Sequence, residues 1–164
     1  MTIAIPLYPA FDFPLIWLAG KAGGSSDTPG NGSEELERIR AMKLNILVVD
    51  NNGPFRTSFL KKLGKVFNAV VDGADGGASA LRKAAAQPDL DLILMDISMP
   101  VMNGFETYEG LRNNQVMARV VLMTAHKRPE YRERAAAMQL TILNKPIDDR
   151  ELRQVLLSCR GKVS

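Results

Sequence analysis

Four polar side chains that could carry chemistry follow short runs of apolar residues. Asp50 comes directly after LVV, Asp96 after LILM and Thr124 after VVLM, while Lys145 lies one residue beyond a further short run. A protein that needed only solubility would not require an aspartate directly after two buried runs. The positions therefore predict one polar site rather than scattered surface charge.

The residue types at these positions fit phosphoryl chemistry. Two carboxylates held close together repel each other and need a compensating cation, which a divalent hard metal such as Mg²⁺ and a lysine can both supply. A metal-bound carboxylate can attack a phosphoryl group and form an acyl phosphate, while the metal and the Lys145 ammonium neutralise the transferring oxygens. The Thr124 hydroxyl could donate a hydrogen bond to a phosphoryl oxygen.

The elements that position these side chains alternate between short apolar runs and longer stretches of helical period. We expect strands over residues 45–49, 69–71, 92–95, 120–123 and 141–143, and helices over 54–62, 78–87, 105–113, 129–138 and 149–160. The alternation predicts an α/β fold, an open doubly wound parallel sheet whose strands are buried on both faces. Such sheets bind ligands beyond the carboxyl ends of their strands, which brings the four polar residues to one edge.

Residues 45–158 resemble the response-regulator receiver domain of two-component signalling. The motifs that carry the resemblance are ILVVDN at 46–51, LILMDISMPVMNGFE at 92–106, VVLMTAH at 120–126 and NKPID at 144–148. The resemblance implies a five-stranded flavodoxin-like (βα)5 fold with strand order 2-1-3-4-5. It also implies that Asp96 is the phosphoacceptor, Thr124 the switch hydroxyl and Lys145 the pocket lysine.

The same resemblance implies a Mg²⁺ site and a cis peptide bond. The implied cis bond joins Lys145 to Pro146. The implied metal ligands are side chains and one main-chain group that follow the first and third strands: Asp50, Asn51, Asp96 and the backbone carbonyl of Ser98.

The sequence departs from the family pattern at two positions that bear on switching. The family usually has a second acidic residue after its first strand, and this residue is normally the direct metal ligand, but here it is Asn51. A unit charge pair near 4 Å is worth about 4 kcal/mol at an effective dielectric constant of 20, so we expect weaker Mg²⁺ binding. Ile142 stands where the family commonly carries a tyrosine or phenylalanine that reports the state of the site.

The amino-terminal part of the chain differs in composition from the rest. Residues 1–32 comprise an apolar segment and a Gly- and Ser-rich linker, residues 33–43 a short lead-in helix, and residues 44–161 the receiver domain. The apolar stretch over 3–20 is interrupted by prolines and Asp12, so we expect no membrane span. The lone cysteine, Cys159, excludes an internal disulfide, which suits a reducing, cytoplasmic location.

Three functional interpretations follow. The first is a phosphoacceptor that receives its phosphoryl group from a histidine kinase or phosphotransfer protein and is not an enzyme with a separate substrate. Phosphorylation would change a protein-binding face, which would then bind an unknown downstream protein or a second copy of the chain. The second is a pseudo-receiver that binds a partner without phosphorylation. The third is a flavodoxin-like or nucleotide-binding enzyme, which the absence of a phosphate-cradling glycine loop after the first strand disfavours. The mild net charge of +3, with interspersed signs, predicts no nucleic-acid binding.

Overall fold

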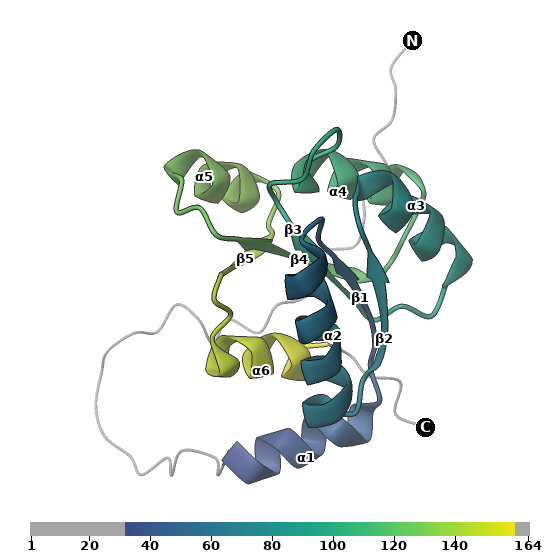
Figure 1. Ribbon diagram of the computed structural model, residues 1–164, viewed down its shortest axis with the longest axis vertical. Helices are drawn as coiled ribbons and strands as arrows, with labels where there is room; N and C mark the ends of the chain where they lie inside the picture. Colours follow the sequence, from purple (N-terminus) through teal and green to yellow (C-terminus); the bar gives the residue numbers. More distant parts are fainter. Residues whose placement is uncertain (1–31, 160–164) are drawn as a thin grey trace.

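The computed structural model describes residues 32–159. Five strands alternate with helices, and one further helix precedes the first strand (Figure 1). The strands are β1 (Asn45–Val49), β2 (Val70–Ala74), β3 (Leu92–Asp96), β4 (Arg119–Thr124) and β5 (Thr141–Asn144). The helices are α1 (Gly32–Met42), α2 (Gly53–Phe67), α3 (Gly77–Ala86), α4 (Gly104–Asn113), α5 (Pro129–Ala137) and α6 (Asp149–Leu157).

All five strands pair in parallel, in the order β2-β1-β3-β4-β5, so the predicted fold is confirmed. The order reverses beside β1, between β1 and β3, which is where ligands bind in sheets of this type. The expectation that every strand is buried on both faces holds for β1, β3 and β4 and is wrong for the two edge strands. Val70 in β2 is 64% exposed and Thr141 in β5 is exposed, because no strand of the described residues pairs with the outer side of β2 or β5.

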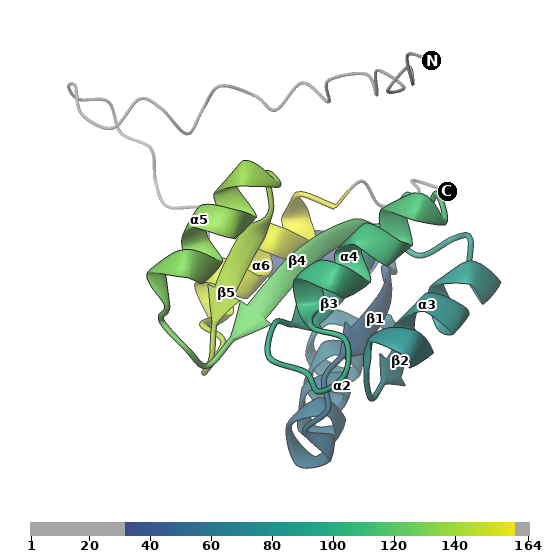
Figure 2. The same cartoon turned by 90° about the horizontal axis from the view of Figure 1, so that it is seen from above.

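Helices cover the sheet on both faces (Figure 2). One half of the core joins side chains of α1, α2 and α6 to one face of the central strands, and the other joins α3, α4 and α5 to the opposite face. Alternate residues of the central strands supply both halves: Ile46 and Val48 enter the first, whereas Leu47 and Val49 enter the second. This alternation explains why these strands are apolar at nearly every position.

Two elements extend more than one residue beyond their predicted ends, and one ends more than one residue early. The helix predicted over residues 54–62 continues to Phe67, because Leu63 and Phe67 are both buried four residues apart, and it ends at a left-handed Asn68 with φ 56°. Strand β2 continues through Asp72 and Gly73 to Ala74. These two residues interrupt the apolar pattern, which an edge strand tolerates because it is less buried than a central strand. Helix α6 ends at Leu157, before its expected end at residue 160.

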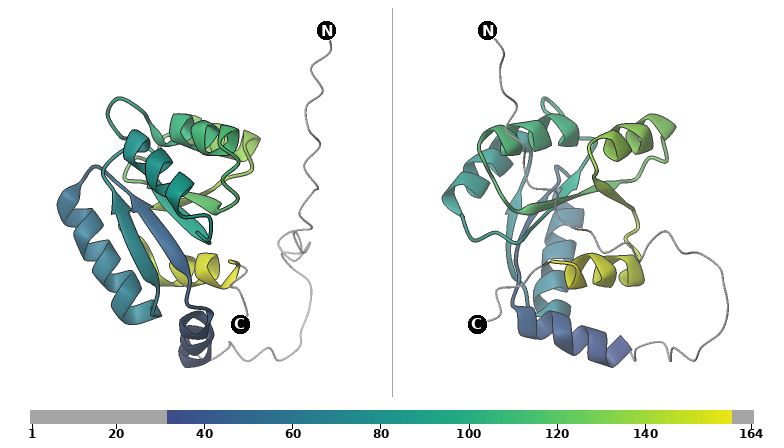
Figure 3. Two further views of the ribbon diagram at one scale, coloured as in Figure 1. Left: turned by 90° about the vertical axis from the view of Figure 1, so that its right-hand side faces the viewer. Right: turned by 180° about the vertical axis from the view of Figure 1, so that it is seen from behind.

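Helix α1 belongs to the same core as the sheet, and it packs beside α6 and against the C-terminal end of α2 (Figure 3). Ile39 is only 1% exposed within the half of the core that α2 and α6 line. The Arg40 guanidinium donates to the Val66 carbonyl oxygen at 2.8 Å, and the Asn68 amide donates to the Arg40 carbonyl oxygen at 3.3 Å. Both bonds satisfy polar groups where helices end.

Replacing Ile39 with alanine is expected to lower the free energy of unfolding by about 2–4 kcal/mol, because the change removes buried apolar atoms and leaves a cavity. Urea unfolding followed by circular dichroism measures the loss. Arg38 is exposed on the same helix, so Arg38→Ala is the matched control and should change stability by less than about 0.5 kcal/mol. Equal stability of both variants would mean that α1 does not fold with the sheet.

Two sequence expectations concern residues away from the sheet edge. Within residues 32–159 no helix combines the length and apolar character that crossing a bilayer requires, and the apolar stretch over 3–20 lies outside the described residues.

Cys159 is buried, and this burial raises the pKa of its thiol to about 11. Its thiolate is therefore scarce near neutral pH, and the side chain acts as a small apolar residue of the core.

Candidate phosphoryl-transfer site

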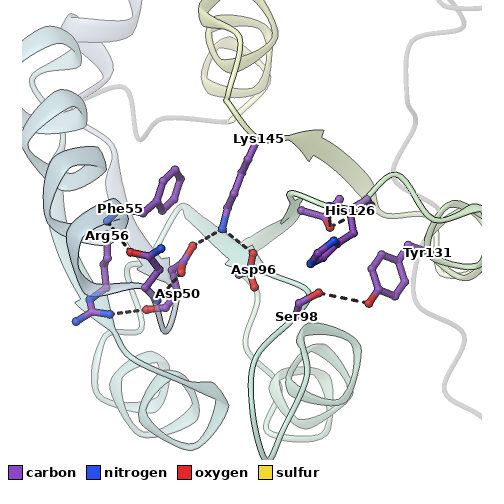
Figure 4. A network of polar contacts seen from close by, with 10 residues as sticks. Asp50, Phe55, Arg56, Asp96, Ser98, His126, Tyr131 and Lys145 are labelled. Carbon is purple, nitrogen blue, oxygen red and sulfur yellow. Dashed lines mark hydrogen bonds and ion pairs between the residues drawn. The ribbon is translucent and has the colours of Figure 1, made fainter.

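Lys145 joins the two aspartates that were predicted to meet at the carboxyl edge of the sheet (Figure 4). Its Nζ lies 2.5 Å from Asp50 Oδ2 and 2.6 Å from Asp96 Oδ1. Asp50 is 1% exposed and Asp96 is 5% exposed, while the lysine side chain is 15% exposed. The ammonium therefore compensates the mutual repulsion of two nearly buried carboxylates, which would otherwise be costly to hold together.

Local main-chain bonds fix Asp50 at the end of β1. Its Oδ1 accepts a hydrogen bond from the Asn52 amide at 2.8 Å, and Asn52 in turn caps α2 by accepting from the Phe55 amide at 3.0 Å. The Arg56 guanidinium, one turn into that helix, donates to the Asp50 carbonyl oxygen. The turn after β1 thus holds the carboxylate toward Lys145 while it starts the next helix.

Close packing of the following loop fixes Asp96 in the same way. A Cβ atom on Gly104 would lie 2.6 Å from the Asp96 carbonyl oxygen, so only glycine fits at the start of α4. Asn103 and Glu106 form a capping box at the same helix end. The loop from Asp96 to α4 therefore returns tightly against the end of β3, which fixes the main chain that carries the carboxylate.

One oxygen of Asp96 remains available for chemistry. Lys145 binds Oδ1, and within residues 32–159 no hydrogen bond engages Oδ2. The carboxylate of a nearly buried residue, with one oxygen beside an ammonium and the other without a hydrogen-bond partner among residues 32–159, is suited to attack a phosphorus atom. The ammonium can then neutralise the phosphoryl oxygens.

Thr124 and Lys145 end neighbouring strands, as predicted. The Lys145 backbone amide donates to the Thr124 carbonyl oxygen at 2.8 Å. The Thr124 hydroxyl accepts from the His126 amide at 3.0 Å and lies 3.3 Å from the His126 carbonyl oxygen, so it binds its own loop rather than a carboxylate. His126 is exposed and lies beside the site in Figure 4.

The oxygen donors expected to hold Mg²⁺ lie along this edge. Asp50 and Asp96 supply carboxylates, Asn51 follows Asp50 and is exposed, and the Ser98 carbonyl accepts no hydrogen bond from the described residues. Hard oxygen donors of this kind fit Mg²⁺. No group of three Asp, Glu, His or Cys side chains converges within residues 32–159, and residue 51, which follows Asp50, carries an amide rather than a carboxylate.

The structure adds two aromatic side chains that the sequence did not single out. Phe55 of α2 places its ring 4.3 Å from Lys145 Nζ, on a side of the ammonium that neither carboxylate occupies. In Figure 4, Tyr131 of α5 lies beyond Asp96 on the side away from Phe55, and its hydroxyl is 3.3 Å from Ser98 Oγ. Neither residue belongs to a strand end or a family motif, so no sequence signal identified them. The predicted cis bond between Lys145 and Pro146 is present.

A double-mutant cycle tests the contact between Phe55 and Lys145. Combining Phe55→Leu with Lys145→Met should reveal a coupling of about 1 kcal/mol in the free energy of unfolding, because leucine keeps the apolar contact but lacks the ring's negative face. Phe59 stacks on Phe55 at 5.4 Å, and Phe59→Leu paired with Lys145→Met provides the control cycle. Coupling of the same size in both cycles would show that the ring does not act on the ammonium.

Comparison with known proteins gives one family and several relatives. Residues 29–157 match the family model described as "Response regulator receiver domain". The chain is 30% identical over 125 residues to Two-component system protein A of Emericella nidulans and 31% identical over 137 residues to Sensor histidine kinase GacS of Pseudomonas protegens. These alignments cover 68% and 79% of this chain but only 18% and 14% of the relatives.

Solved structures give the same picture. The fold is similar to chemotaxis protein CheY4 of Vibrio cholerae, with a TM-score of 0.61 and 27% identity over 71% of this chain and 98% of that one. A second neighbour, from the CheX-CheY-BeF3-Mg complex of Borrelia burgdorferi, has a TM-score of 0.60 and 25% identity over 70% of this chain and 87% of that one.

Proposed function

The chain belongs to the response regulator receiver domain family, and on that premise we propose that Asp96 accepts a phosphoryl group from a phosphohistidine. The donor is a histidine kinase or a phosphotransfer protein, the class to which sensor kinase relatives such as GacS point. The observation that carries the proposal is Asp96 Oδ2, which lies in the carboxylate that Lys145 binds and has no hydrogen-bond partner among residues 32–159. The module changes its own state and acts on no separate substrate.

The transfer is balanced in atoms and charge. Asp96 Oδ2 forms a bond to phosphorus, the bond between phosphorus and the histidine nitrogen breaks, and that nitrogen keeps the electron pair. The Lys145 ammonium, now 2.6 Å from Oδ1, neutralises charge on the phosphoryl oxygens as they arrive. Water later cleaves the acyl phosphate, which regenerates the carboxylate and releases phosphate.

The other site residues hold and sense the group. Receiver domains bind Mg²⁺, and here Asp50, Asn51, Asp96 and the Ser98 carbonyl would hold it. When bound, the ion neutralises negative charge on the phosphoryl oxygens. The Thr124 hydroxyl, bound to the His126 main chain in the structure, would leave that loop to donate to a phosphoryl oxygen. Movement of the loop then changes the binding face used by a downstream protein.

Phosphorylation by a small acyl-phosphate donor with Mg²⁺ tests the proposal on the full chain. Intact mass spectrometry should show one added phosphoryl group, and Asp96→Asn should abolish the addition. Asp91→Asn is the matched control, because Asp91 precedes the same strand at its opposite end and accepts a hydrogen bond from the Asn45 amide at 2.8 Å. A wild-type chain without an Asp96-dependent adduct would favour the pseudo-receiver interpretation.

A further inference from the structure

A hydroxyl bridge links the loop after Asp96 to helix α5. Ser98 lies two residues after Asp96, and its Oγ is 3.3 Å from the Tyr131 hydroxyl (Figure 4). The base of the loop is fixed, because the Ile97 amide donates to the Met123 carbonyl oxygen and the Gly104 amide donates to the Ile97 carbonyl oxygen, both at 2.9 Å. The bridge thus connects a rigid loop base to the first turn of another helix.

Tyr131 also contacts side chains at the start of α4 and α5. Its ring lies 6.1 Å from the Phe105 ring, and the Arg128 guanidinium lies 5.6 Å from its centre. Arg134 covers the Phe105 ring at 4.6 Å and pairs with Glu109 at 3.1 Å. A shift of Tyr131 would therefore displace exposed charged side chains on both helices.

Ile142 stands where the family commonly carries the aromatic ring that reports the state of the site. Tyr131 lies where its ring and hydroxyl can report that state instead. Ile142 and Tyr131 pack, partly buried, against the same half of the core. Ile142 has no polar atom in its side chain, whereas the Tyr131 hydroxyl reaches the phosphorylation loop directly. Among the two, only tyrosine can exchange hydrogen bonds with that loop.

We propose that Tyr131 transmits the state of Asp96 to α5 through Ser98, an inference that rests on the proposed phosphorylation. A phenol is the more acidic hydroxyl, so Tyr131 donates to Ser98 and leaves the serine proton free. A phosphoryl group on Asp96 brings three strong acceptor oxygens beside Ser98, and the serine turns its proton toward one of them. Donation by Ser98 strengthens its acceptance from Tyr131, so phosphorylation holds α5 more firmly against the loop.

Hydrogen exchange of the full chain, with and without beryllofluoride and Mg²⁺ as the phosphoryl mimic, tests the relay. Amides of α5 should exchange about fivefold more slowly in the wild-type complex, the factor that one neutral hydrogen bond supplies. Tyr131→Phe and Ser98→Ala should each remove most of this protection, and the double variant should remove no more. Ser98→Thr retains the hydroxyl and should preserve the response.

Tyr108→Phe is the matched control, because Tyr108 lies on α4 and its hydroxyl makes no hydrogen bond to the described residues. Fluorine NMR reports independently whether each variant forms the beryllofluoride complex. If the complex forms and Tyr131→Phe responds like the wild type, the relay is wrong and the proposed function stands. If neither the complex nor a phosphoryl adduct forms on the wild-type chain, both are wrong.

Discussion

Replacing Lys145 with methionine should slow phosphorylation of Asp96 by about 10²–10³-fold, the usual cost of removing one group that stabilises developing charge. The ammonium lies 2.5 and 2.6 Å from the two carboxylates, so no other cation within residues 32–159 is as close to Asp96. The affinity of the site for Mg²⁺ should stay the same or rise, because the variant removes the repulsion between the metal ion and the Lys145 ammonium, which lies between Asp50 and Asp96. Intact mass spectrometry gives the rate and calorimetry the affinity.

Two further variants separate charge from position. Lys145→Arg keeps the charge but replaces a compact ammonium with a planar fork, so we expect a loss of about tenfold. Lys62→Met removes a lysine that pairs with Asp149 on the surface, and it should leave the rate within about twofold of wild type, since surface pairs contribute little. A Lys145→Met protein that is phosphorylated at the wild-type rate would exclude charge neutralisation by this lysine.

Changing Asn51 to aspartate should tighten Mg²⁺ binding by about 10–100-fold. A full charge pair near 4 Å contributes about 4 kcal/mol at an effective dielectric constant of 20, and repulsion from Asp50 and Asp96 offsets part of it. About 1.4–2.8 kcal/mol then remains, which corresponds to this range of affinity. Calorimetric titration with MgCl₂ measures the change directly, without any phosphoryl donor.

Asn52 offers a control that differs by one position and adds the same charge. Asn52 caps α2, and aspartate caps a helix as well as asparagine does, so Asn52→Asp preserves the local structure. Its carboxylate remains bound to the Phe55 amide, away from the metal, and we expect a change in Mg²⁺ affinity below about threefold. Equal tightening in both variants would mean that net charge, rather than a ligand at position 51, controls the metal.

The sequence by itself determined the fold of this protein and the edge of the sheet at which the predicted site residues lie. Buried parallel strands require nearly continuous apolar runs, and a polar residue directly after such a run must lie at the carboxyl edge of the sheet. Asp50, Asp96, Thr124 and Lys145 could therefore be placed together without coordinates. Edge strands do not obey this pattern as strictly, which is why β2 was predicted too short and too deeply buried.

Only the tertiary structure decided how these side chains are partnered. Lys145 binds Asp96 through one oxygen, and the other has no hydrogen-bond partner in the part of the chain that the structure describes. The Thr124 hydroxyl binds its own loop, and Phe55 covers the ammonium. The bridge from Ser98 to Tyr131 and the insertion of Ile39 into the core likewise join segments far apart in the chain. Rotamers and interhelix contacts depend on how separate elements pack, and the periodicity of one element carries no information about its neighbour's side chains.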